Sequence, residues 1–191
     1  MKKLTRAIAI ATMAVIPVVG LSAAPAGAKT VTPQKWAAGF CTALSTWQDS
    51  IKASSADVTS ALSDTTDLQK DKTTLVDFLS QAIDATDTAI SDVKATGSPN
   101  TTNGTQIQAA IVKALGQAKS IFTKAEADSE KLPTDDAATF GTEATAIGTQ
   151  IQNSSTSIDS GFAKVDKLDK GGKLGKVVKA TKACAFLSAS A

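Results

Sequence analysis

The sequence predicts an all-α fold, an up-down four-helix bundle with a short added C-terminal helix, closed by one disulfide. Three observations lead to this prediction. Apolar residues recur at steps of three and four through four long segments, polar or glycine- and proline-containing turns separate the segments, and the two cysteines lie far apart in the chain. From these patterns we expect helices over residues 33–63, 71–95, 105–131 and 174–187, and a fourth long helix between a cap at Thr134 or Asp135 and the glycines at 171 and 172.

The first predicted helix carries the clearest apolar stripe. It begins with Thr32 as the N-cap and Pro33 as the first helical residue, where the missing proline N–H costs nothing. Interrupted only at Ser55, one face then holds Trp36, Phe40, Leu44, Trp47, Ile51, Val58 and Leu62. Full burial of these side chains would contribute roughly 10–20 kcal/mol as an upper estimate, so this helix needs partners that cover it.

The second and third predicted helices follow the same period. A polar turn from Asp64 to Asp71 precedes the second helix, and the residues 97–100, Gly-Ser-Pro-Asn, end it. Its inward face holds Leu75, Leu79, Ile83, Thr86, Ile90 and Val93. The third helix follows a Thr/Asn/Gly loop and ends at Pro133, which cannot donate a helical hydrogen bond. Its inward face holds Ile107, Ile111, Ala114, Ala118, Ile121, Phe122 and Ala125.

The fourth predicted helix is capped by Thr134 or Asp135 and ends before the pair Gly171 and Gly172. Its stripe is Phe140, Ala144, Ile147, Ile151, Ser155, Ile158, Phe162, Val165 and Leu168. Short loops between long helices favour antiparallel neighbours, which gives the up-down order. The final, shorter helix then returns beside the first one.

The positions of the two cysteines can be compared within this arrangement. At about 1.5 Å of rise per residue, Cys41 lies roughly 12 Å above the start of the first helix and Cys184 roughly 15 Å above the start of the last. In an exported protein, two cysteines at matching heights indicate a disulfide. We therefore expect a bond between Cys41 and Cys184.

Several small residues interrupt the apolar stripes at one level. Counting from the helix ends places Thr86, Ala114, Ala118 and Ser155 roughly 20 Å above the bundle base, which is the height of Trp47. One large ring opposite several small side chains predicts ordinary core packing. The alternative interpretation is a pocket for an apolar ligand among the helices.

Residues 1–28 have the pattern of a signal peptide, and residues 29–191 are expected to form a single helical-bundle domain. Three basic residues precede an apolar run, and small residues at 26–28 offer a cleavage point. Of the 20 basic residues three lie in this segment, so 17 basic and 18 acidic residues remain, a net charge of −1. No later segment is long and apolar enough to span a bilayer. We expect a secreted protein that is extracellular or loosely associated with the envelope.

The residue types that are absent restrict the chemistry. The sequence has no His and no Tyr, and both Cys are assigned to a disulfide, so the usual nucleophilic triads and zinc sites are missing. We therefore predict no enzymatic activity, no metal and no cofactor; haem in particular lacks its usual axial ligands. Several aspartates lie near loops and helix starts: Asp64, Asp67, Asp71, Asp84, Asp87, Asp135 and Asp136. We interpret them as helix caps, with calcium binding or acid–base work as the alternative.

Lysines recur at every third residue near the C-terminus: Lys164, Lys167, Lys170, Lys173, Lys176, Lys179 and Lys182. Within 164–182 seven lysines oppose two aspartates, a net charge of +5, whereas residues 29–163 carry ten basic and sixteen acidic residues, a net charge of −6. One interpretation is solvated spacers and charges favourable at helix C-termini. The functional hypothesis is a basic end that binds anionic envelope polymers or lipid head groups. Nucleic acid is not expected, because no aromatic residues interleave the lysines.

A resemblance can be given on two stretches of sequence. Residues 36–47, WAAGFCTALSTW, and 183–187, ACAFL, behind a signal peptide, resemble small exported or lipid-anchored helical proteins of high-GC Gram-positive bacteria. The resemblance implies a place outside the cytoplasm and supplies no functional residues. Together with the residue pattern it predicts a secreted, non-enzymatic binding or structural module at the cell envelope. The alternative is a carrier of an apolar small molecule, a lipid or similar, in the bundle core.

Overall fold

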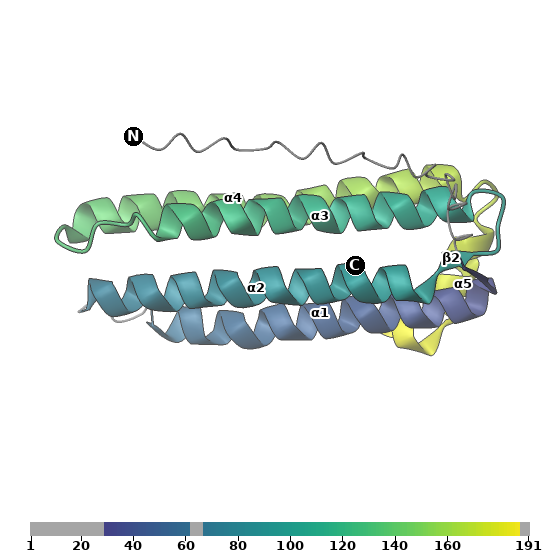
Figure 1. Ribbon diagram of the computed structural model, residues 1–191, viewed down its shortest axis with the longest axis horizontal. Helices are drawn as coiled ribbons and strands as arrows, with labels where there is room; N and C mark the ends of the chain where they lie inside the picture. The colour runs from purple at the N-terminus through teal and green to yellow at the C-terminus, as the bar shows by residue number, and fades with distance from the viewer. Residues whose placement is uncertain (1–28, 62–66, 188–191) are drawn as a thin grey trace, which may run out of the picture.

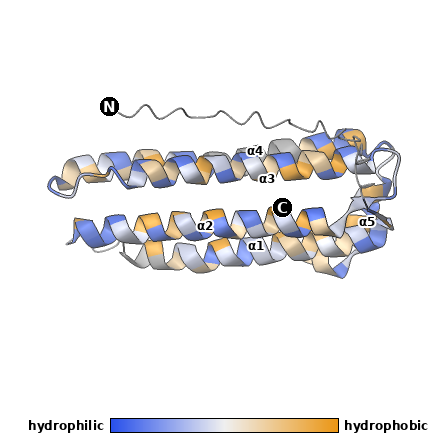
Figure 2. Ribbon diagram, viewed as in Figure 1, coloured by the Kyte–Doolittle hydropathy of each residue, from blue (hydrophilic) through white to orange (hydrophobic). Residues whose placement is uncertain are grey.

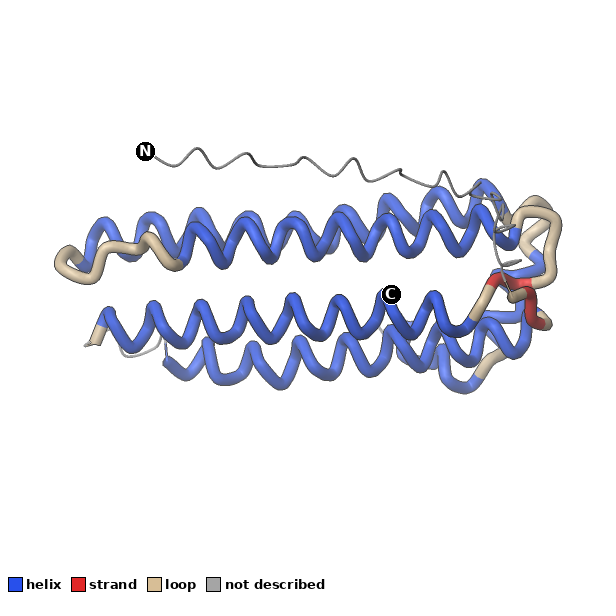
Figure 3. Tube along the Cα trace, in the orientation of Figure 1, coloured by secondary structure: helices blue, strands red, loops and turns tan. Residues whose placement is uncertain are grey.

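The computed structural model describes residues 29–61 and 67–187, without the side chains at 57, 59–61 and 153–162, and the described chain is mostly helical. The elements in chain order are β1 (Thr30–Val31), α1 (Pro33–Ala61), α2 (Leu68–Thr96), β2 (Ser98–Pro99), α3 (Gly104–Ser129), α4 (Ala137–Leu168), α5 (Lys173–Ala180) and the 3-10 helix η1 (Lys182–Leu187). The four long helices extend along the long axis of the molecule, and the described loops lie at its two ends (Figures 1 and 3). The predicted all-α class is confirmed.

Three contacts show how the long helices follow one another. The start of α1 pairs with the end of α2 through β1 and β2. The Lys72 ammonium at the start of α2 donates to the carbonyl of Leu132, 3.1 Å away and just after α3. Asn103 before α3 donates from its side-chain amide to the carbonyl of Leu168 at the end of α4, at 2.6 Å. These contacts place the start of α1 beside the end of α2, the start of α2 beside the end of α3, and the start of α3 beside the end of α4; α2 contacts both α1 and α3.

The helix starts follow the capping chemistry of the sequence. The Lys35 N–H donates to the Thr32 hydroxyl oxygen at 3.3 Å, so Thr32 caps α1 as predicted. The second helix starts earlier than expected, at Leu68, because Asp67 accepts a hydrogen bond from the Lys70 N–H at 3.0 Å. Asp71 consequently lies buried in the first turn of α2 and not in a polar turn.

The other differences from the predicted bounds lie at helix ends. Asp136, not Thr134 or Asp135, is the N-cap of α4, because its carboxylate accepts from the Ala138 N–H at 3.0 Å. The third helix ends at Ser129, before the expected residue 131. The predicted last helix divides at Thr181, whose backbone is extended, so that α5 is separated from η1.

The parallel pair β1 and β2 was not predicted. The Ser98 N–H donates to the Lys29 carbonyl at 2.8 Å, and the Asn100 N–H donates to the Val31 carbonyl at 2.8 Å. Gly97 makes the turn from α2 into this pair with φ of 83°, and a Cβ there would lie 2.3 Å from the Lys29 oxygen. Only glycine fits this position without displacing the N-terminal strand.

The core consists of two clusters of buried apolar residues. Among the long helices, α1, α2 and α3 supply the buried side chains of the first cluster, and α2, α3 and α4 supply those of the second; partly buried side chains of α4 pack against the first and of α1 against the second. Hydrophobic residues recur along each of these helices with hydrophilic residues between them (Figure 2). Trp47 packs against both clusters, and its indole N–H donates to the Thr86 hydroxyl oxygen at 3.0 Å. Thr86 and Ala118 are fully buried, as the packing interpretation of this level requires. The side chain of Ser155 lies outside the described residues.

Candidate functional site

A cleft lies at the end of the molecule where the chain enters α1 and α5. It has a volume of about 620 Å³ and is lined by residues 100–103, by 168–170 at the end of α4, by Pro33, and by Lys173, Leu174 and Val177 of α5. We call it the basic cleft. Its size is within the range of 300–1,000 Å³ that is usual for small-molecule sites.

Local hydrogen bonds fix the walls of the basic cleft. The bond from Asn103 to the Leu168 carbonyl joins the loop at 100–103 to the end of α4. Gly171 and Gly172, with φ of 96° and 64°, turn the chain from α4 into α5. The carboxylate of Asp169 accepts from the Gly175 N–H at 2.9 Å, which fixes the first turn of α5 against the end of α4. The glycine pair, expected only as a helix end, thus shapes the cleft.

The structure exposes all seven lysines of the series and brings two of them into the basic cleft. Lys170 and Lys173 line it with one carboxylate, Asp169, so its ionised residues sum to +1. The other five lie on exposed positions of α4, α5 and η1: Lys164, Lys167, Lys176, Lys179 and Lys182. Within the described part of the chain none of the seven lysines forms an ion pair, so their charges face solvent.

One hydrogen-bonding group without an internal partner also lies at this cleft. The hydroxyl oxygen of Thr101, which lines the cleft, is buried and has no hydrogen-bond partner among the described residues. The first turn of α5 is already capped, because the Asp169 carboxylate accepts from the Gly175 N–H. Two ammonium groups and the Thr101 hydroxyl fit an anionic group better than a neutral one.

A second, smaller pocket lies beside the basic cleft and shares Asp169 and Leu174 with it. This apolar pocket has a volume of about 110 Å³, and its apolar lining is Trp36, Phe40, Ile111, Val165, Leu174 and Val178. The rings of Trp36 and Phe40 are stacked, with centroids 4.8 Å apart. Trp36 is 1% exposed, and its indole N–H has no acceptor among the described residues.

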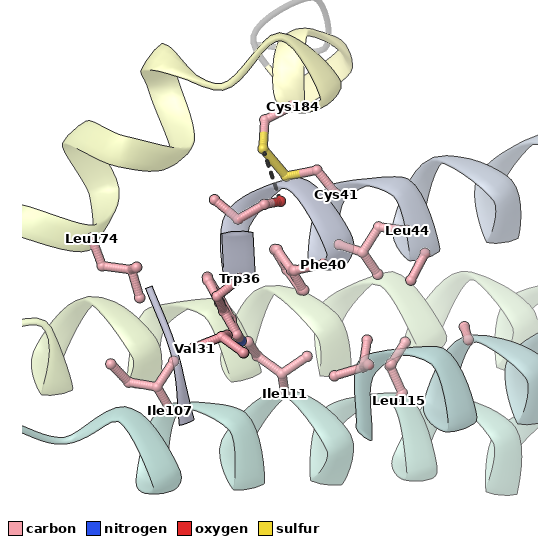
Figure 4. Packing of buried hydrophobic residues seen from close by; sticks show 14 residues of the cluster. Val31, Trp36, Phe40, Cys41, Leu44, Ile107, Ile111, Leu115, Leu174 and Cys184 are labelled. Carbon is pink, nitrogen blue, oxygen red and sulfur yellow. Dashed lines mark hydrogen bonds between the residues drawn. A yellow bond between two sulfur atoms is a disulfide. The ribbon is translucent and has the colours of Figure 1, made fainter. Parts of the chain in front are cut away.

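The disulfide between Cys41 and Cys184 holds the wall that covers both pockets. It is present as predicted, with the two Cα atoms 5.0 Å apart, and it attaches η1 to α1. Figure 4 shows the bond above Trp36 and Phe40, with Leu174 of α5 to one side. Both α5 and η1 pack on α1, so the disulfide fixes the segment that carries Lys173 and Leu174.

Metal-binding groups and membrane-spanning helices are two other features with a bearing on function. In residues 29–61 and 67–187, no group of three His, Cys, Asp or Glu side chains could hold a metal ion. The same residues contain no helix that is long and apolar enough to cross a membrane. Comparison with known proteins finds no matching family model, curated protein or solved structure. Function therefore has to be inferred from the site itself.

The polar loop that lines one side of the basic cleft was not predicted from the sequence. Asn100, Thr101 and Asn103 belong to a loop with no chemical motif, and their role depends on how that loop folds against the end of α4. The available signal was the excess of Asn and Thr in a loop that the predicted up-down order places at the same end as the lysines.

Proposed function

We propose that this protein is a secreted, non-enzymatic helical module that binds an anionic partner at the cell envelope through the basic cleft. The observation that carries the proposal is the placement of Lys170 and Lys173 beside the polar loop 100–103 in one cleft. Anionic envelope polymers and lipid head groups both present the phosphate or carboxylate groups that such donors bind. The five exposed lysines around the cleft would add long-range attraction.

The proposed compartment is supported by the covalent chemistry of the chain. A disulfide that closes nearly the whole domain is stable in oxidising compartments and rare in the cytoplasm. Residues 1–28 have the composition of a signal peptide, which would deliver the chain there. The absence of His and Tyr from the sequence favours binding over catalysis.

For the scaffold we propose a closed up-down four-helix bundle. The three contacts between helix ends support it, and so does the core, since Trp47 and Ile51 of α1 pack against the cluster that contains Ile147 of α4. Pro33 at the start of α1 and Leu168 at the end of α4 line the same cleft, as expected when both helix ends lie at one end of the bundle.

The second candidate function is a carrier of an apolar small molecule. The apolar pocket with the buried indole N–H of Trp36 is the observation that favours it. Native mass spectrometry of protein purified from its own producer would test this candidate. A co-purifying lipid or pigment would support the carrier function.

The test of the proposal is retention on isolated cell envelopes across a salt series. The variant Lys170→Gln with Lys173→Gln removes both cleft ammonium groups, and Lys52→Gln with Lys113→Gln removes two exposed charges on α1 and α3 as a matched control. We expect retention at low salt to fall in the cleft variant only, and retention of the wild type to fall toward 1 M salt, where the screening length is about 3 Å. Equal retention of the two variants would contradict the role of the cleft.

A further inference from the structure

The basic cleft and the apolar pocket, which we together call the recess, lie side by side and share two lining residues. Leu174 and Asp169 line both, and Leu174 is buried at the boundary between them. The loop 100–103 and two lysines line the cleft, whereas Trp36 and Ile111 line the pocket. One molecule could therefore contact both without a change of fold.

The chemistry of the recess changes along its length. On the cleft side are Lys170 and Lys173, on the pocket side are apolar side chains with Asp166, and Asp169 lines both. An anionic group is attracted to the ammonium side and repelled by the two carboxylates, while a hydrocarbon chain is favoured only in the apolar pocket. The recess thus selects an amphiphile and sets its direction.

Two features of the pocket indicate an occupant. Trp36 lines this pocket, and its buried indole N–H has no acceptor among the described residues, which costs free energy. Leu187 also lines this pocket, and its large apolar side chain is exposed to solvent. A hydrocarbon chain in the pocket would cover part of it.

We propose that the recess binds one anionic phospholipid, with its phosphate head group between Lys170 and Lys173 and the first part of an acyl chain in the pocket beside Trp36. This inference rests on the proposed binding of anions by the cleft and names the partner. The cleft of about 620 Å³ has room for a glycerophosphate group. The pocket of about 110 Å³ is somewhat smaller than an engineered cavity of about 150 Å³ that binds benzene, so it holds a short stretch of chain.

The experiment uses ¹⁵N-labelled, disulfide-bonded protein and follows its indole N–H signals by NMR. The chain has two Trp, so a Trp47→Phe variant assigns the Trp36 signal. The probes are glycerol 3-phosphate, and phosphatidylglycerols with acyl chains of four, six and eight carbons below their micelle concentrations. Phosphatidylcholines of the same chain lengths control for head-group charge.

We expect glycerol 3-phosphate to shift backbone amides of the cleft, including that of Lys173, and to leave the Trp36 indole unchanged. Phosphatidylglycerol should shift the Trp36 indole N–H and leave the Trp47 signal in place. Each methylene that enters the pocket should raise affinity about fourfold until the pocket is full, after which longer chains add nothing. Phosphatidylcholine should bind more weakly at every length.

Two substitutions separate the two halves of the recess. Gly175 lies on α5 at the pocket, and a Cβ there would meet only the Asp169 side chain, at 3.7 Å. Gly175→Leu therefore adds bulk without a backbone clash, and Gly175→Ala is its matched control. We expect Gly175→Leu to abolish the chain-length dependence and retain binding of glycerol 3-phosphate. The pair Lys170→Gln and Lys173→Gln should remove the preference for phosphatidylglycerol over phosphatidylcholine.

The outcomes distinguish this inference from the proposed function. If glycerol 3-phosphate binds at the cleft but acyl chains add no affinity and do not shift Trp36, the phospholipid is excluded and an anionic polymer remains as the partner. If neither glycerol 3-phosphate nor phosphatidylglycerol perturbs the cleft, both proposals are wrong. The titration of the wild-type protein decides between these cases even if a variant fails to fold.

Discussion

Removal of the disulfide tests how the binding end is held in place. The bond joins residues separated by 143 positions, and the chain-entropy relation for a loop of this length gives a stabilisation of about 5 kcal/mol as an upper limit. Cys41 is 0% exposed and Cys184 is 2% exposed, so the double variant Cys41→Ala with Cys184→Ala avoids burying new polar groups. We expect the free energy of unfolding to fall by about 2–5 kcal/mol.

The assay is urea unfolding followed by circular dichroism, with reduced wild-type protein as the control that should match the variant. Helical content should change little before unfolding, because α5 has eight residues and η1 six, whereas each long helix has at least 26. Binding of glycerol 3-phosphate should weaken in parallel, since Lys173 lies on the released segment. A loss of stability below about 1 kcal/mol, or unchanged binding, would refute this account of the disulfide.

Three further predictions concern single side chains. Trp47→Ala should lower the free energy of unfolding, measured in urea, by about 3 kcal/mol. This is the low end for loss of a tryptophan, because the ring is only half-buried, although its indole N–H also donates to Thr86. A loss under about 1 kcal/mol would contradict the place of Trp47 between the two clusters. Hydrogen bonds from the Thr139 hydroxyl and the Ala138 N–H hold the pKa of Asp136 below its ordinary value of 3.8. The Asp136 carboxylate thus stabilises the fold above pH 3.8, and this stabilisation is lost as the pH falls through the folded pKa. Asp136→Ala should therefore lower Tm at pH 7 and match the wild type in strong acid. A difference in Tm that stays constant with pH would count against the cap. Lys173→Gln should leave Tm unchanged or raise it in calorimetry, because this cation lies in the first turn of α5; a clear decrease would assign the lysine to stability.

The helices and the disulfide were accessible from the sequence because both depend on regular geometry. The repeat of 3.6 residues placed one face of α1 inward from Trp36 to Ile51, and Thr32 with Pro33 fixed its start. The bond between Cys41 and Cys184 is present as predicted, although the height of Cys184 was calculated along a helix that in fact breaks at Thr181. Properties that follow from a period need no knowledge of the neighbouring chain.

The site was less accessible because it depends on contacts between irregular segments. The pair β1 and β2 has two residues in each strand, too short for any alternation to be visible. The hydrogen bond from Asn103 to the Leu168 carbonyl joins residues 65 positions apart and has no sequence pattern. The break at Thr181 was missed because the residues on both sides have helical propensity. The lysine series was identified from the sequence, but the cleft that Lys170 and Lys173 line was not.

The helix ends separate the two interpretations of the lysine series residue by residue. Lys167 and Lys179 lie in the last turns of α4 and α5, where a cation interacts favourably with the helix dipole, so their positions have a structural explanation. Lys173 occupies the first turn of α5, where the same dipole disfavours a cation, and Lys170 lies between the two helices. Lys173 therefore gains nothing from the dipole of α5, and it lines the basic cleft together with Lys170. An anion bound between them would offset the unfavourable placement of Lys173, which is the arrangement expected where charge is positioned for a ligand and not for the stability of the helix.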